Sequence, residues 1–384
     1  MKKLNILMVH PHDIYSAKEP WTIRIVEIAR VFTKWGHNVK LVYFPLPKKE
    51  RGKLKSEKIN EFVTIPFSRR AYHLIKNIFE IQKYAKWADV IHVQKCFANA
   101  AIPALFGAYI HKKHIHYDWD DWEFEIYNFS PPSIFFGNYL NYMEKTLPKL
   151  VDSMSVASYK LEELAIGLSF PKKKIAMAHV GVNLDRFNPR HKSKEIKEKY
   201  NLKKKVILYL GQLNGAQYAE LVIKSYKQIL KKRNDISLLI VGGGSNLESL
   251  KNKTNELGLQ NDVVFTGFIH DNEVPLCINV ADVAVASFEK NKITECKSPL
   301  KIVEYLGSGK AIVASDVGEV NRMIGQAGIV VKTGSVKSIT NAILKILDNS
   351  KLQKDLEKKA RIQAEQNFNW EITAKNILDV YVVN

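Results

Sequence analysis

The sequence predicts an α/β protein with two domains, each built on a parallel sheet. Its 384 residues exceed what a single hydrophobic core usually organises. Short apolar runs of strand length alternate with longer helical segments, which is typical of parallel sheets with crossover helices. The alternation breaks once, at residues 181–204, where Gly181, Pro189 and a run of Lys and Glu predict a linker. We therefore expect one domain over residues 1–180 and a second over residues 205–368.

The first half is expected to contain seven strands. They lie near residues 4–10, 38–44, 62–66, 89–93, 114–118, 152–157 and 175–179. Helices are expected between them over residues 21–35, 68–86, 97–112, 131–149 and 159–167. Such a sheet binds ligands at the carboxyl ends of its strands.

The second half shows the same alternation of strands and helices. Strands are expected near residues 205–211, 236–241, 262–266, 282–286 and 311–314, and the chain closes with helices near 336–348, 351–366 and 369–383. No sequence repeat is visible, so the two halves share an architecture rather than a sequence. We expect two Rossmann-like domains that face each other across a cleft.

The composition is that of a globular protein, with 46% hydrophobic and 25% charged residues. The three cysteines, Cys96, Cys277 and Cys296, are widely spaced and indicate neither a disulfide framework nor a zinc site. The apolar run Leu4 to Val9 is too short for a signal peptide, and no stretch has membrane-spanning length. A cytoplasmic protein is the expectation.

The net charge of +19 predicts a polyanionic partner. No nucleic-acid-binding module is recognisable, so nucleic acid is not expected. Residues 67–87 combine Lys and Arg with apolar residues at helical spacing, which suits a helix lying on an anionic membrane at the inner face of the cell membrane. An ordinary surface helix is the alternative. Residues 131–142 are rich in aromatics that suit lipid or an acceptor cleft.

The segment from Ser298 to Asp316 is the most informative part of the chain. Ser298 suits a helix N-cap and Pro299 the first helical position, and the apolar run 311–314 predicts a buried strand after the helix. The free N–H groups of Leu300 and Lys301 would favour an anion at the helix mouth. Glu304, three residues after Lys301, shares its helix face. This pattern suits a nucleotide or sugar-phosphate site.

The same segment resembles the donor-site signature of the retaining GT-B glycosyltransferases of family four. In that family an acidic residue on a helix, matched here by Glu304, holds the ribose hydroxyls of a nucleotide sugar. The resemblance extends over nearly the whole chain. It includes residues 35–39, the interdomain element 179–187, the glycine turn 241–244 with Gly244, the strand end 264–268 with Phe268, and the start of the last helix at 368–370.

The resemblance implies a GT-B fold with a C-terminal helix, within residues 369–384, that crosses back to the N-terminal domain. It also implies a glycosyltransferase that takes a nucleotide-sugar donor and a glycan, lipid-linked or polysaccharide acceptor. The donor would lie in the C-terminal domain and the acceptor in the N-terminal one. Relatives generally work without a metal, so neither a metal nor a cofactor is expected.

One departure from the family concerns the diphosphate. The family usually has Gly-Arg-Leu after the first strand of the second domain and a Lys about four residues later. This chain has Gly211, Gln212 and Leu213, and then Gln217. A glutamine donates hydrogen bonds without charge, and charge-assisted bonds are about twice as strong. Lys297 and Lys301 are expected to compensate.

A second departure concerns the acid that contacts the donor sugar. The family places it eight residues before the acid matched by Glu304, and that position here is Cys296. Glu295 lies one place away, and we expect it to contact the sugar if a one-residue bulge restores its position; Glu289 is another acid nearby. A solvated loop acid is the alternative.

The N-terminal domain has its own candidates. In the loop after the first strand, His12, Lys18 and Arg24 are expected near the acceptor or an anionic substrate. At the end of the 114–118 strand, Asp118 and Asp120 are expected to orient the acceptor hydroxyl or to stabilise charge at the anomeric carbon. A solvated turn is the alternative for these acids.

Two other functions stay open at this point. The glutamines at 212 and 217 would suit a non-catalytic GT-B subunit that binds a sugar or partners an active enzyme, and a sugar-nucleotide epimerase would share the fold. A Rossmann dehydrogenase is disfavoured, because no Gly-x-Gly-x-x-Gly pattern follows a strand with an acid about 20 residues on.

Overall fold

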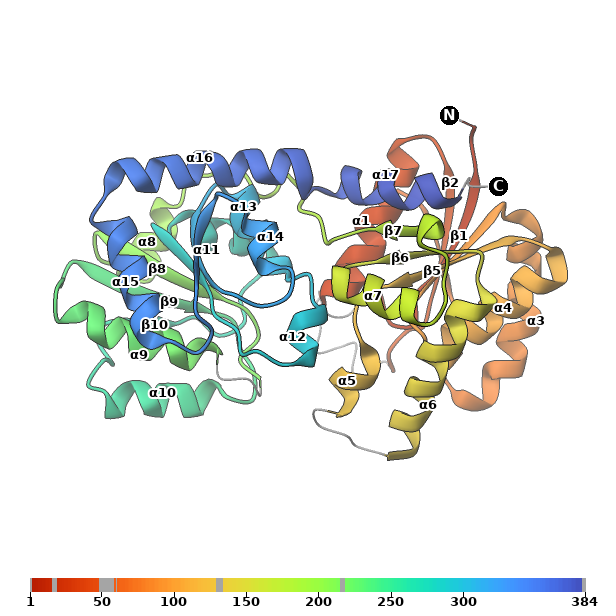
Figure 1. Cartoon of the computed structure of the whole chain (residues 1–384), viewed down its shortest axis with the longest axis horizontal. Coiled ribbons are helices and arrows are strands. Elements are labelled where there is room, and N and C mark those ends of the chain that lie inside the picture. The colour runs from red at the N-terminus through yellow and green to blue at the C-terminus, as the bar shows by residue number, and fades with distance from the viewer. Residues whose placement is uncertain are drawn as a thin grey trace. The chain divides into compact units, whose positions relative to one another are not determined.

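The protein forms two parallel sheets covered by helices in a computed structural model that describes residues 2–15, 19–47, 59, 61–128, 134–214 and 218–381 (Figure 1). Two compact units divide the chain. The first contains residues 1–180, 296–298 and 370–384, and the second contains residues 181–295 and 299–369. The first unit is therefore made from three separate pieces of the sequence.

The first unit has a seven-stranded sheet in the order β3-β2-β1-β4-β5-β6-β7, parallel throughout. Its strands are β1 (Asn5–Val9), β2 (Asn38–Tyr43), β3 (Val63–Pro66), β4 (Val90–Gln94), β5 (His114–Trp119), β6 (Ser153–Val156) and β7 (Ile175–Met177). The strand order reverses between β1 and β4, which is where open sheets of this kind bind ligands.

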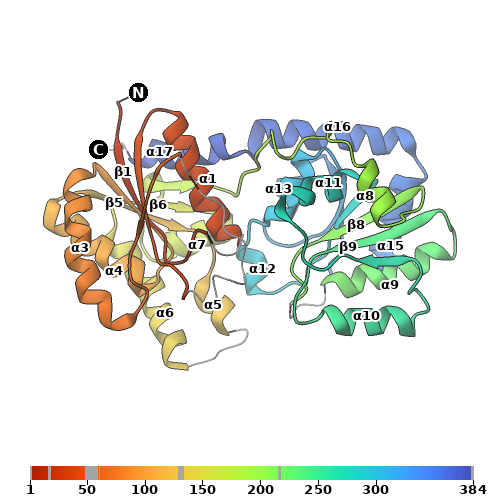
Figure 2. The same ribbon diagram turned by 180° about the vertical axis from the view of Figure 1, so that it is seen from behind.

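Helices cover both faces of the first sheet (Figures 1 and 2). They are α1 (Pro20–Lys34), α3 (Leu74–Trp87), α4 (Ala98–His111), α5 (Glu123–Asn128), α6 (Ile134–Thr146), α7 (Tyr159–Gly167) and the last helix, α17 (Trp370–Tyr381). The inner faces of α3, α4 and α6 share one core cluster with β4 and β5. The helix α17 packs on α1, β6 and β7.

The second unit repeats this plan with a six-stranded parallel sheet in the order β10-β9-β8-β11-β12-β13. Its strands are β8 (Lys205–Leu210), β9 (Ile236–Val241), β10 (Val263–Phe265), β11 (Val283–Ala286), β12 (Ala311–Ser315) and β13 (Gly328–Val331). β8, β9, β11 and the first four residues of β12 are apolar apart from Lys205 and Ser237, as expected for strands covered on both faces.

The helices of the second unit are α8 (Lys194–Lys199), α9 (Tyr218–Leu230), α10 (Leu247–Glu256), α11 (Val274–Asn279), α12 (Lys292–Cys296), α13 (Leu300–Gly307), α14 (Val320–Ile324), α15 (Val336–Leu347) and α16 (Ser350–Asn367). No helix among the described residues has both the length and the apolarity needed to cross a bilayer.

Most predicted elements match the structure within a few residues, and the differences have local causes. The helix expected over 68–86 begins at Leu74, after a short 3-10 turn at Ala71–His73. The short edge strand β13 was not predicted. The expected linker 181–204 contains the helix α8 and is part of the second unit.

Candidate functional site

Glycine backbone forms the carboxyl edge of the second sheet, where β8 and β9 end. A Cβ added to Gly242 would lie 2.0 Å from the Gly211 carbonyl oxygen, and one added to Gly244 would lie 2.2 Å from Asn214 Oδ1. Both glycines, like Gly211, have positive φ. The loops after β8 and β9 therefore pack closer than side chains would allow.

Hydrogen bonds join these two loops. The Leu213 N–H donates to the Gly243 carbonyl at 3.0 Å, and the Asn246 N–H donates to the Leu213 carbonyl at 2.8 Å. The Asn214 side chain accepts from the Ser245 N–H at 2.7 Å. Gln212, predicted to lie at the diphosphate, is exposed beside these two hydrogen-bonded loops. Its side chain has no hydrogen bond among the described residues. Gln217 lies outside the described residues.

Lys301 projects from the first turn of α13 toward the end of β8. Its ammonium lies 3.4 Å from the Tyr209 hydroxyl and over the Tyr209 ring, 4.4 Å from its centroid. A Cβ on Gly211 would come within 2.7 Å of the same ammonium. A positive charge thus sits beside the glycine backbone at the strand end, which is favourable for an anionic ligand.

Glu304 lies one turn further along α13 and is half-buried. Among the described residues, no hydrogen bond or ion pair engages its carboxylate. Burial raises the pKa of Glu304 to about 8, with the charge of Arg186 opposing the shift and that of Asp271 adding to it. A carboxyl group in this state gains from any ligand that donates hydrogen bonds to it.

Phe268 adds an aromatic surface to the same edge. It follows β10, its side chain is 78% exposed, and its ring packs so closely on Gly243 that a Cβ there would lie 2.7 Å from ring carbons. It offers a stacking surface for a planar ligand.

The start of α13 differs from the sequence prediction. The N-cap residue is Pro299 rather than Ser298, and Leu300 is the first helical residue. The Ser298 hydroxyl instead accepts a hydrogen bond from the Val180 N–H at 3.1 Å, so it does not cap the helix. Lys297 and Ser298 are part of the first unit. Lys297 is half-buried, and no ion pair holds it among the described residues.

Glu295 lies on the short helix α12. Its carboxylate is 3.9 Å from the Lys290 ammonium and is partly exposed. Gly318, at φ +45°, fits against the backbone carbonyls of Thr294 and Glu295, where a Cβ would come within 2.7 Å of both oxygens. The close approach fixes the backbone of α12 rather than the Glu295 side chain.

In the first unit, two of the predicted site residues bind each other. Arg24 donates to both carboxylate oxygens of Asp118, at 2.8 and 2.7 Å, and to the Ala178 carbonyl at 2.7 Å. Both side chains are fully buried. Burial would raise the pKa of Asp118, but Arg24 holds it well below its usual range. The expectation of an accessible Asp118 and Arg24 is therefore corrected: this pair lies in the core.

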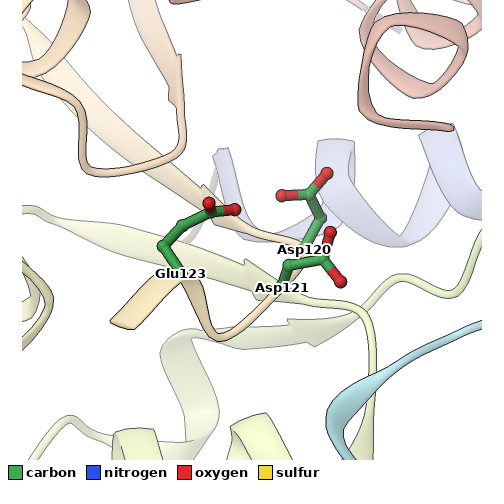
Figure 3. Close-up of side chains that lie close together, drawn as sticks. All are labelled: Asp120, Asp121 and Glu123. Carbon is green, nitrogen blue, oxygen red and sulfur yellow. The ribbon is translucent and has the colours of Figure 1, made fainter. Parts of the chain in front are cut away.

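Asp120 takes part in a second ion-pair cluster. The Lys95 ammonium lies 3.0 Å from Asp120 and 3.3 Å from Asp121, and it also pairs with Glu123. Figure 3 shows the three carboxyl groups together on the loop after β5, and their ligand atoms lie within 4.8 Å of one another. Lys95 takes the place that a metal ion would need, so the donor set does not fit a cation as it stands.

The ion-pair cluster is buried, and its pKa shifts reflect this. Burial raises the pKa of Glu123 to about 7 and also raises that of Asp120, with Lys95 opposing both shifts. Burial opposes the charge of Lys95 as well, but the three carboxylates raise its pKa well above the usual value. Gln94 donates to Asp120 at 3.0 Å and so links β4 to this loop.

The loop after β1 contributes histidines and a tryptophan. His10 is buried and pairs with Gln94 at 2.7 Å, and burial lowers its pKa to about 3. His12 is less buried and packs on the Trp21 ring at 5.1 Å. The Nδ1 atom of His12 has no hydrogen-bond partner among the described residues. Lys18 lies outside the described residues.

Two side chains that hold this edge of the sheet together were not predicted from the sequence. Lys95 has no motif around it; it follows β4 with a left-handed backbone (φ +63°), and its ammonium lies among the acids. Glu144, on α6, accepts hydrogen bonds from the Trp119 indole and from the backbone N–H groups of Glu123 and Phe124. Its position beside Met143 on the buried face of the helix was the available signal.

The fold resembles solved glycosyltransferase structures, and the sequence resembles glycosyltransferase sequences. A solved glycosyltransferase from Rickettsia africae covers 99% of this chain with a TM-score of 0.74 and 18% identity, over 98% of its own length. Anabaena HepE, solved with UDP and glucose, covers 98% with a TM-score of 0.75 and 14% identity, over 98% of its own length. Two Rossmann-like units with these neighbours define the GT-B fold.

Two family models match by sequence: "Glycosyltransferase Family 4" at residues 22–186 and "Glycosyl transferases group 1" at residues 192–363. An uncharacterized glycosyltransferase of Methanocaldococcus jannaschii is 27% identical over 64% of this chain and 63% of its own length. Alpha-monoglucosyldiacylglycerol synthase of Streptococcus pneumoniae is 24% identical over 76% and 66%. The chain thus spans just under two thirds of these relatives. The comparisons support a transferase of the glycosyltransferase class.

Proposed function

We propose that the chain transfers a sugar from a nucleotide-sugar donor to a glycan, lipid-linked or polysaccharide acceptor, with retention at the anomeric carbon. The observation that carries this proposal is Glu304, a half-buried carboxyl group without a protein partner among the described residues, one turn from the Lys301 ammonium. The two side chains suit the hydroxyl groups and the diphosphate of one ligand.

The other residues of the donor site have roles that follow from their positions. Gly211 and Gly244 keep the strand ends free of side chains, Phe268 stacks on the base, and Gln212 donates an uncharged hydrogen bond. The N–H of Leu300 and the nearby Lys297 and Ser298 help to bind the diphosphate, because backbone N–H groups and cations stabilise a leaving anion. Glu295 contacts the donor sugar. No metal ion or cofactor is part of the proposal.

The acceptor is proposed to bind at the carboxyl edge of the first sheet. His12 is the predicted group that is partly exposed there, and Asp120, which is buried and paired with Lys95, would orient the acceptor hydroxyl. We place the enzyme in the cytoplasm at the inner face of the cell membrane. The three cysteines are buried and none of them forms a disulfide among the described residues, which is consistent with a reducing compartment.

Titration calorimetry with a panel of nucleotide sugars tests the donor site. We expect at least one to bind, and Glu304→Ala to abolish that binding without a change in the unfolding midpoint. Glu248→Ala, which removes an exposed acid on α10, is the matched control and should bind normally. Failure of every nucleotide sugar to bind would refute the proposal, and the anomeric configuration of the product, read by NMR, tests retention.

A second candidate function is a non-catalytic sugar-binding subunit that partners an active glycosyltransferase. Gln212 favours it, because an uncharged side chain stands exposed at the position expected to neutralise the diphosphate. Donor binding without turnover, together with a stable complex with a second glycosyltransferase, would decide for this function.

A further inference from the structure

The outward face of α3 is apolar and basic at once. Ile75 and Phe79 lie about one turn apart on α3, Tyr72 lies in the 3-10 turn just before the helix, and Phe79 is 74% exposed. Exposed lysines flank them on the same face: Lys76, Lys83 and Lys86. The opposite face of the helix carries the residues that pack into the core, including Ile81 and Ala85. Exposed large apolar residues in a row are unusual on a globular surface.

The neighbouring helix α4 repeats this arrangement. Phe106, Tyr109 and Ile110 are exposed at spacings of three and one residues, with Tyr109 exposed by 88%. Lys112 follows at the end of the helix and is also exposed. Gly107 packs against Ala85 of α3, where an added Cβ would come within 2.9 Å of that side chain. The two helices therefore pack directly together.

The helix α6 adds a third stripe of the same kind. Phe135 is 89% exposed, and Tyr142, two turns on, is exposed as well. Lys145, in the last turn of α6, and Lys149, in the 3-10 turn that follows the helix, are also exposed. Phe136 of α6 stacks on Phe97, the N-cap residue of α4, so the two helices approach each other at their N-terminal ends.

These helices cover one face of the first sheet, since their inner sides share one core cluster (Figures 1 and 2). We call their outward residues the three-helix face; it comprises Tyr72, Ile75, Lys76, Phe79, Lys83, Lys86, Phe106, Tyr109, Ile110, Lys112, Phe135, Tyr142, Lys145 and Lys149. Its aromatics and lysines come from separate helices, so the combination is a property of the folded surface.

Negative charge is nearly missing from these helices. Their sequences contain two acids, Glu80 and Glu144. Glu80 pairs with Lys76 at 3.5 Å, and Glu144 is buried beneath α5. The surface helix α16 instead alternates the two signs, with pairs such as Lys359–Asp355 and Arg361–Glu365. On α3, α4 and α6 the lysines thus lie beside exposed aromatics, and the one acid among them at the surface, Glu80, is paired with Lys76.

We propose that the three-helix face docks on an anionic lipid bilayer. Aromatic and aliphatic side chains enter the interfacial region while lysines contact lipid phosphates, and the two contributions add. The charge complementarity favours a membrane over an acidic or basic protein partner, because the face offers apolar area and positive charge without any patterned opposite charge. The inference extends the membrane location proposed above, and its test is read independently of sugar transfer.

Vesicle co-sedimentation of the full chain tests the docking face. We expect binding to vesicles of phosphatidylcholine with phosphatidylglycerol, weaker binding as salt increases, and little binding to phosphatidylcholine alone. The triple variant Lys83→Glu, Lys86→Glu, Lys145→Glu should weaken binding by at least about 100-fold. Lys351→Glu, Lys354→Glu, Lys358→Glu on α16 changes the net charge equally and should have a much smaller effect.

A second variant separates insertion from charge attraction. Phe79→Ser with Tyr109→Ser should weaken binding about tenfold or more, and that loss should persist at high salt. Both side chains are exposed, so circular dichroism and the unfolding midpoint should match the wild type. Equal losses in the two triple variants, strong binding to neutral vesicles, or self-association through this face without vesicle binding would overturn the proposal. Donor binding by calorimetry reports on the sugar site separately.

Discussion

In the first unit, the charged groups at the carboxyl edge of the sheet pair with one another inside the protein. Arg24 binds Asp118, and Lys95 binds three acids. The corresponding edge of the second unit has glycine backbone, an exposed Phe268 and the Glu304 carboxyl group. Both sheets reverse their strand order at this edge, so equal topology does not give equal chemistry. Most charged groups at the first edge thus pair within the protein, whereas the Glu304 carboxyl group at the second edge has no such partner among the described residues.

The largest loss of stability is expected when Arg24 is replaced. Arg24→Met leaves the Asp118 carboxylate buried without its cation, and removing one partner of a buried pair costs about 3–5 kcal/mol. We expect the free energy of unfolding, measured by chemical denaturation, to fall by that amount. A loss below about 1 kcal/mol would mean that the pair is not structural.

The second largest effect on the stability of the protein is expected at the glycines of the second edge. Gly242 and Gly211 both have positive φ, but a Cβ on Gly242 meets the Gly211 carbonyl, whereas one on Gly211 meets the end of the flexible Lys301 side chain. Gly242→Ala should therefore destabilise the protein by about 2 kcal/mol more than Gly211→Ala. Gly211→Ala should instead weaken donor binding, because it displaces the lysine. Denaturation and calorimetry on the same two variants separate these outcomes; equal unfolding midpoints would contradict the difference.

Glu304 should make donor binding to the second unit depend on pH. Its pKa is raised to about 8, and hydroxyl donors of a ligand favour the charged form. Donor affinity should rise about tenfold between about pH 7 and about pH 9, as the fraction of ionised Glu304 increases. In the control Glu304→Gln the affinity should be weak and independent of pH. A wild-type affinity that falls over this range would exclude the assigned role.

The smallest effect is expected at an exposed ion pair of the first unit. Lys34, on the same helix as Arg24, contacts Glu371 at 2.6 Å, with both side chains largely exposed. Lys34→Met should change the free energy of unfolding by less than about 1 kcal/mol, because solvent screens such pairs. This variant is the control for Arg24→Met, and a comparable loss in both would show that burial does not set the difference.

The alternation of apolar runs and helical segments was enough to predict the two sheets and most helix bounds. Strands such as β9 are uninterrupted apolar runs between turn residues, and this pattern is local. The short β13, which begins at a glycine, carried too weak a pattern. The family resemblance predicted the GT-B fold, and the structural neighbours confirm it.

The site was less predictable, because its contacts join distant parts of the chain. Arg24 and Asp118 are 94 residues apart, and nothing near either residue indicates that they form a pair. The same holds for Lys95, which lies 28 residues before Glu123. Glu304 and Lys301 were predictable because both lie on one helix, where spacing fixes their shared face.

The helix α17 has a consequence for how the protein is made. It is part of the first unit, where the Tyr381 hydroxyl pairs with buried His92 at 2.6 Å and the ring contacts His116. A ribosome synthesises the whole second unit before it reaches this helix. All of the second unit is therefore available to fold before α17 covers its part of the first unit. Until then the apolar surfaces of β6, β7 and α1 that α17 covers are exposed to solvent during translation. The first unit, although its synthesis begins first, thus receives its last helix only after the second unit has been synthesised.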